Sequence, residues 1–132
     1  MKPIQRLDLF TGPIVTVTGV GPVTPTEGLD VSGVNGDWTV FCEVVSQSPA
    51  KRFQITLEGS ADGFSTRTVH LIAGGAGSIG PTADKVYSVR KYELPDSWII
   101  GSVDGKLRCD VTKLDSGSSL TMRAWVQWAS AL

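Results

Sequence analysis

The segment Leu120–Ala129 reads LTMRAWVQWA, and its side chains alternate between two sets. Leucine, methionine, alanine, valine and tryptophan occupy every second position from Leu120 to Trp128. Because successive side chains of a β-strand point to opposite faces, this period of two predicts a long strand with one buried face. The opposite, outer face then carries Arg123 and Trp125 together with threonine and glutamine.

The same alternation recurs upstream in five further segments, at residues 38–45, 52–58, 67–72, 85–93 and 106–111. Turn sequences rich in Gly, Pro, Asp and Ser separate them. The composition agrees, with 15 Val, 12 Thr and 7 Ile against 8 Ala and 4 Glu, because β-branched side chains suit strands and crowd helices. We therefore predict an all-β chain, folded as an antiparallel β-sandwich that is either immunoglobulin-like or jelly-roll-like.

The first 30 residues differ from the rest of the chain. Proline fixes φ and removes an amide donor, so a central strand is not expected where prolines are frequent. The prolines of this region are Pro3, Pro13, Pro22 and Pro25. We predict that residues 1–30 form an extended N-terminal arm, with at most an edge strand near 14–18, and that residues 31–132 form the sandwich domain.

Four apolar side chains of this arm have too few partners within it to be buried there. They are Ile4, Leu7, Leu9 and Phe10. We expect them to be the anchors that bind a neighbouring protein, because an extended segment can cover a large area of a partner. The alternative is that they fold back on the sandwich of their own chain.

Length and charge exclude several classes of partner. The chain has 132 residues and a formal charge of −1, which gives no polybasic surface for nucleic acid or for anionic membranes. No window approaches the roughly 18 apolar residues of a membrane span, and the N-terminus carries no apolar secretion segment. We expect synthesis in a cytoplasm, with neither nucleic acid nor membrane as a partner.

Groups suited to catalysis or metal binding are few. His70 is the sole histidine, so neither a multi-histidine metal site nor an obvious acid–base grouping can be built. The glycine-rich segment 74–80 lacks the Gly-Lys-Ser/Thr ending of a phosphate loop and is expected to be a hairpin loop. We expect no enzymatic activity, no catalytic or metal-binding residues and no cofactor.

Cys42 and Cys109 both fall on inward positions of predicted strands. Without a secretion signal, two reduced thiols in the core are the favoured interpretation. A disulfide across the core is the alternative, and an intact-mass comparison with and without reductant decides between them.

Trp125 and Arg123 are further candidates for a partner contact, because an exposed tryptophan beside an arginine is typical of an interface hot spot. Trp125 could instead pack beneath the N-terminal segment. A third interpretation is a carbohydrate-binding face, since such sandwiches also display tryptophan.

From about Gly28 onward, the chain resembles small virion proteins of tailed bacteriophages, the β-sandwich head-decoration or minor capsid proteins. The similar segments are LDVSG at 29–33, FQITLEGSADG at 53–63, YELP at 92–95, LRCDV at 107–111 and AWV at 124–126. The motifs consist of turn sequences and strand alternation, which also occur in tail and fibre modules.

The resemblance implies a non-enzymatic capsid decoration protein. Its partners would be the major capsid protein and other copies of itself, as a homo-oligomer on the outer surface of the virion. It would be made in the bacterial host cytoplasm. A tail or head–tail connector protein of the same virion, a carbohydrate-binding module and an unrelated cytoplasmic binding module remain the alternatives.

Overall fold

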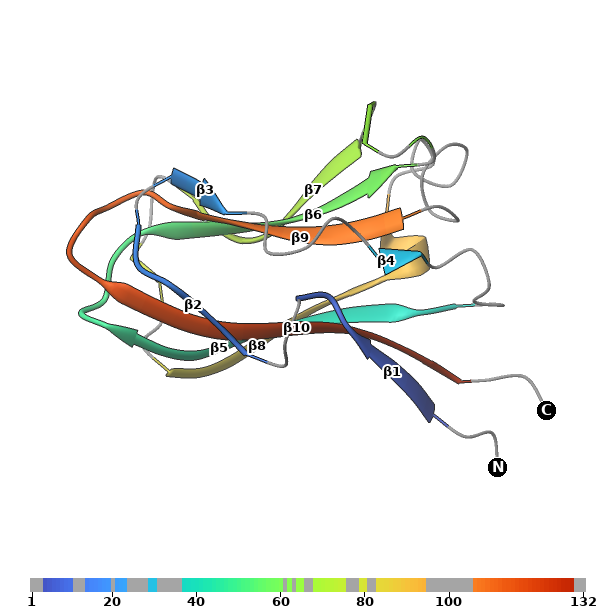
Figure 1. The fold of residues 1–132 in the computed structure, drawn as a ribbon. Helices are drawn as coiled ribbons and strands as arrows, with labels where there is room; N and C mark the ends of the chain where they lie inside the picture. Colours follow the sequence, from blue (N-terminus) through green and yellow to red (C-terminus); the bar gives the residue numbers. More distant parts are fainter. Residues whose placement is uncertain are drawn as a thin grey trace.

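The computed structural model describes residues 4–10, 14–19, 21–23, 29–30, 37–60, 62, 64–65, 68–75, 79–80, 83–94 and 106–129. Its strands form two antiparallel sheets that pack face to face (Figure 1). The predicted all-β sandwich is therefore confirmed.

The first sheet is built around the longest strand, β10 (Ser119–Ala129). β5 (Thr39–Ser48) pairs with one edge of β10, and β8 (Ala83–Arg90) continues the sheet beyond β5. On the other edge, β1 (Ile4–Asp8) lies beside one end of β10 and β2 (Val15–Val17) lies beside the other (Figure 1). A short 3₁₀ helix, η1 (Lys91–Glu93), follows β8.

The second sheet has the order β3 (Gly21–Val23), β9 (Lys106–Lys113), β6 (Phe53–Ser60) and β7 (Thr68–Gly74), and β4 (Leu29–Asp30) also pairs with β9. The predicted segments match β5, β6, β7 and β9 to within a few residues. The segment predicted at 85–93 begins earlier, at Ala83, and its last three residues form η1.

The core lies between the two sheets and follows the predicted alternation. In β10 the buried side chains are Leu120, Met122, Ala124 and Val126, and Trp128 packs partly against them. In β5 they are Val40, Cys42 and Val44. The opposing sheet contributes the side chains of Phe53, Ile55, Leu57, Leu107, Cys109 and Val111. Trp38, just before β5, is also buried.

The prediction of an N-terminal arm without partners of its own is wrong for the described residues up to Val17. After β1 the chain turns inward. The backbone N–H of Leu9 donates to the carbonyl of Ala124 at 2.9 Å, and the side chains of Leu9 and Phe10 enter the core. The open edge of β10 explains this, because its backbone groups need hydrogen-bond partners that β1 and β2 supply. The alternative, burial against the sandwich of the same chain, is what the structure shows for Leu9 and Phe10, whereas Ile4 and Leu7 remain exposed.

A buried lysine of β9 donates hydrogen bonds to the backbone just after β2. Lys113, at the end of β9, is fully buried, and its ammonium donates to the carbonyls of Thr18, at 3.1 Å, and Ser118. Two carbonyl acceptors partly compensate for the removal of this charge from water. The contact joins the N-terminal segment to the turn between β9 and β10.

A second polar contact joins the start of β6 to the same turn. The Asp115 carboxylate accepts hydrogen bonds from Arg52 Nε at 2.9 Å, from Arg52 Nη2 at 2.7 Å and from the Arg52 backbone N–H at 3.1 Å. The side-chain bonds from Arg52, followed by the backbone bond, lower the pKa of Asp115 to about 2.

Leu9 and Leu7 give a direct test of how the N-terminal segment is buried. Leu9 has no exposed surface, whereas Leu7, two residues away, is 41% exposed. We expect Leu9→Ala to lower the free energy of unfolding by about 2–5 kcal/mol, because it leaves a cavity in the core. Leu7→Ala should change it by less than about 1 kcal/mol. Urea denaturation measures both, and equal small effects would mean that Leu9 is not a core residue.

Asp115 predicts a pH dependence of stability. Because folding lowers its pKa from an ordinary 3.8 to about 2, the carboxylate stabilises the folded state above pH 4. This contribution disappears as the pH falls from about 4 through 2. The difference in urea midpoint between the wild type and Asp115→Asn should therefore narrow between pH 5 and pH 2.

Asp8→Asn is the control for this pH series, because Asp8 lies 3.9 Å from Arg6 in an exposed ion pair. Asp8→Asn should change the urea midpoint little at either pH 5 or pH 2. A constant difference between wild type and Asp115→Asn across this range would contradict the assignment.

Candidate functional site

The outer face of the first sheet carries a stack of three side chains from three neighbouring strands. Trp125 lies on β10, Phe41 is its cross-strand partner on β5, and Arg6 comes from β1 on the opposite side. All three point outward because the alternate positions of these strands are outward positions. We call Arg6, Trp125 and Phe41 the aromatic stack.

The stack covers both faces of the Trp125 ring. The Phe41 ring lies 5.4 Å from it, centroid to centroid, with an interplanar angle of 19°. The Arg6 guanidinium carbon lies 4.0 Å from the ring centroid, which is a cation–π distance. Since Phe41 approaches from the β5 side and Arg6 from the β1 side, they occupy opposite faces of the indole.

The charges around the stack are balanced. Arg123, next to Trp125 along β10, forms an ion pair with Glu43 of β5, with Nε and Oε1 2.7 Å apart. Arg6 is paired with Asp8 on its own strand. These two positive and two negative groups leave the surroundings of the stack without net charge to attract an anion such as nucleic acid. The face suits contact with a protein, where aromatic residues and arginine are enriched.

Strand β1 adds exposed apolar side chains next to the stack. Ile4 is 61% exposed and shares the outer face with Arg6, whereas Leu7 lies on the opposite face of β1. In the described residues, no strand pairs with the outer edge of β1. Such an edge offers both apolar side chains and unpaired backbone groups to a partner.

The six predicted partner-binding residues therefore divide into two groups. Ile4, Leu7, Arg123 and Trp125 lie at or near the surface of the same sheet, where a partner could contact them. Leu9 and Phe10 do not, because their own core buries them. Trp125 lies on the outer face, as the sequence predicted, and Arg6 of β1 covers one face of its ring, as packing beneath the N-terminal segment would require. Its part in a partner contact stays a prediction.

Sequence reasoning missed Arg6 and Phe41 as parts of this site. The alternation of β5 indicated that Phe41 points outward, but nothing local indicated that it is the partner of Trp125. The pairing depends on the register between strands that lie far apart in the sequence.

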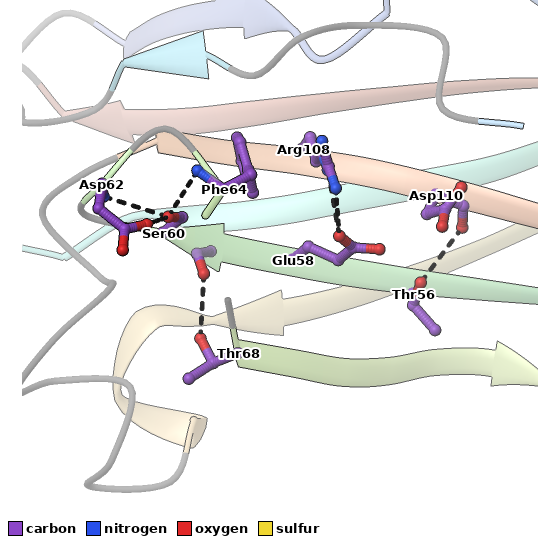
Figure 2. Close-up of polar contacts among 9 residues, drawn as sticks. Thr56, Glu58, Ser60, Asp62, Phe64, Thr68, Arg108 and Asp110 are labelled. Carbon is purple, nitrogen blue, oxygen red and sulfur yellow. Dashed lines mark hydrogen bonds and ion pairs between the residues drawn. The ribbon is translucent and has the colours of Figure 1, made fainter. Parts of the chain in front are cut away.

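A polar cluster lies on the outer face of the second sheet. Figure 2 shows Glu58 of β6 facing Arg108 of β9, with Oε1 and Nη2 2.9 Å apart. The Arg108 guanidinium carbon also lies 3.9 Å from the centroid of the Phe64 ring. The Glu58 side chain is only 3% exposed, so this ion pair is largely shielded from water.

The turn after β6 is organised by one hydroxyl group. Ser60 donates to a carboxylate oxygen of Asp62 at 2.7 Å and accepts the backbone N–H groups of Asp62, at 3.2 Å, and Phe64, at 2.9 Å (Figure 2). Phe64 adopts a positive φ of 68°. We interpret the cluster as a support for the chain after β6.

The described part of the chain contains no group of three or more His, Cys, Asp or Glu side chains that could hold a metal ion. His70 lies on β7 opposite Leu57 and is half-buried. Among the described helical residues, none forms a helix with the length and apolar character needed to cross a bilayer.

Neither protein-family models nor curated proteins match this sequence. Solved structures do. The structure of the infectious bursal disease virus VP2 subviral particle is similar with a TM-score of 0.55 and 10% identity, over 95% of this chain. The alignment spans only 32% of the VP2 chain. At this identity the similarity shows the fold alone: a jelly-roll-like sandwich, one of the two arrangements that the sequence left open.

Carbohydrate-binding modules are similar at a lower level. One is the module of endoglucanase Cel5A from Eubacterium cellulosolvens, with a TM-score of 0.46, 13% identity and coverage of 96% of this chain and 100% of that one. Another structure at this level is that of the CBM22-1 and GH10 modules of xylanase 10B from Clostridium thermocellum, with a TM-score of 0.46, 8% identity and coverage of 99% of this chain and 25% of that one.

Glu58 and Glu43 form a matched pair for testing the buried ion pair. Both pair with an arginine on the adjacent strand, but Glu43 is 23% exposed. We expect Glu58→Gln to lower the free energy of unfolding by about 2 kcal/mol, because it removes the charge that compensates Arg108. Glu43→Gln should cost at most about 1 kcal/mol. Urea denaturation compares them, and equal costs would contradict the structural role of Glu58.

Proposed function

We propose that this chain is a non-enzymatic structural protein of a tailed-phage virion, a decoration protein that binds the outside of the head and stabilises it. Its partner is the major capsid protein, with further contacts between its own copies. It is made in the bacterial host cytoplasm and ends on the capsid surface. The sequence resemblance supports this proposal, and the sandwich fold is compatible with it.

The observation that carries the proposal is the arrangement on the first sheet. A preassembled aromatic stack with balanced charges around it lies beside the edge strand β1, which leaves Ile4 exposed on the same face and Leu7 exposed on the opposite one. Aromatic and arginine side chains held rigid before binding lose little entropy when a partner docks. This combination suits a protein contact that is repeated over many copies of a shell.

Four of the six partner-binding residues predicted from the sequence remain the proposed contact residues. Ile4 and Leu7 make the primary contact, and Trp125 with Arg123 makes a secondary one. Leu9 and Phe10 act indirectly, because their burial anchors β1 to the sandwich and so holds Ile4 and Leu7 in place. The attachment element is then a paired strand, and no role in catalysis or cofactor binding is assigned to any residue.

Carbohydrate binding is the weaker alternative. A sugar ring stacks on a free aromatic face, and in this structure Phe41 and Arg6 cover the two faces of Trp125. Binding a sugar there would require displacement of Arg6. Selective binding on a glycan array that Trp125→Ala abolishes would support that alternative and contradict the assigned use of this face.

The test uses capsids purified from phage that lack this protein. We expect Ile4→Ser combined with Leu7→Ser to weaken binding in co-sedimentation by about tenfold or more, because it removes the exposed apolar surface of β1. The control is Val69→Ser combined with Leu71→Ser on β7, where both side chains are 52% exposed. This control should bind as the wild type does.

Equal binding by both double variants would contradict the role of β1. Deletion of residues 2–12 does not separate attachment from folding, because it also removes Leu9 and Phe10 from the core. The copy number on intact particles distinguishes decoration, with hundreds of copies by icosahedral symmetry, from a tail or connector role with few copies.

A further inference from the structure

The two cysteines of the chain face each other across the core. Cys42 lies on β5 of the first sheet and Cys109 on β9 of the second, and their sulfur atoms are 3.9 Å apart. Both are free thiols, and neither has any exposed surface. They bring together two strands that are not neighbours in any sheet.

The surroundings of this thiol pair are apolar. Along β5, the inward neighbours of Cys42 are Val40 and Val44, and along β9 those of Cys109 are Leu107 and Val111; all four are fully buried. The chain contains only these two cysteines. A disulfide formed within one copy therefore has a single possible connectivity, and it would link the two layers.

We propose that Cys42 and Cys109 form a disulfide site that covalently joins the two sheets when the chain folds in the presence of a small disulfide oxidant. In the first step, the thiolate of one cysteine attacks oxidised glutathione, forms a mixed disulfide and releases one glutathione thiolate. In the second step, the other cysteine thiolate attacks the protein sulfur of the mixed disulfide and releases the second glutathione. The two protein thiols lose two protons and two electrons, and the glutathione disulfide is reduced to two thiols.

Disulfide formation is expected mainly during folding, before the two sheets have packed together. The contact with Cys42 and burial in the apolar core raise the pKa of the Cys109 thiol well above its ordinary value, which leaves little thiolate to react. Glutathione also cannot reach a site without exposed surface. Oxidation is therefore fast while the sheets are apart and slow after they have packed together.

The bond would stabilise the sandwich. It closes a loop between residues that are 67 positions apart, and a crosslink over so long a loop strongly restricts the unfolded chain. Closing it requires the sulfur atoms to approach from 3.9 Å to a bond length of about 2 Å. Protein made in a reducing cytoplasm keeps both thiols, whereas protein refolded in oxidising solution gains the crosslink.

The experiment refolds the full chain from denaturant, either in a mixture of oxidised and reduced glutathione or in excess reductant. After alkylation in denaturant, we expect two alkylated thiols in the reduced sample. The oxidised sample should have none, and an intact mass about 2 Da below that of the unalkylated reduced chain. The oxidised form should also melt roughly 10 °C higher. Native protein given the same glutathione mixture should oxidise at least about tenfold more slowly.

The matched controls are Cys42→Ala and Cys109→Ala. Neither can form the internal bond, so oxidant should leave the melting temperature of each monomer unchanged. Three results would overturn the proposal. They are two alkylated thiols after oxidative refolding, a mixed disulfide with glutathione that never converts to the internal disulfide, and a crosslinked form that melts below the reduced one. The outcome is independent of capsid binding, so it tests this site separately from the proposed function.

Discussion

The pairing of both edges of β10 is the constraint on which the rest of the structure depends. An eleven-residue strand presents backbone donors and acceptors along its whole length, and each one that is left unpaired in the interior is costly. β5 satisfies one edge. The other edge is satisfied by β1 and β2, two short strands separated by the segment that carries Leu9 and Phe10 into the core. The N-terminal region is thereby a structural part of the first sheet.

This pairing also creates the candidate site. Because β1 lies directly beside β10, the guanidinium group of Arg6 reaches the indole of Trp125, while Phe41 approaches from β5. The same strand leaves Ile4 and Leu7 exposed at the edge. Burial of Leu9 and Phe10 is therefore linked to exposure of Ile4 and Leu7, and the proposed attachment surface is a paired strand.

Contacts between distant segments then hold the two sheets and their turns together. Lys113 and the pair formed by Arg52 and Asp115 fasten the turn between β9 and β10 to the N-terminal segment and to the start of β6. Glu58 and Arg108 join β6 to β9 on the outer face. Cys42 and Cys109, the only two cysteines of the chain, face each other in the core.

The sequence alone determined the all-β class, the positions of the main strands and the outward direction of Arg123 and Trp125. These properties are local, because a period of two assigns each side chain to one face of its own strand. Only the tertiary structure decided that Leu9 and Phe10 are buried in their own chain, and that Arg6 and Phe41 enclose Trp125. Those contacts depend on which strands become neighbours and in which register, and pairing between residues more than 80 positions apart leaves no periodic signal in either segment.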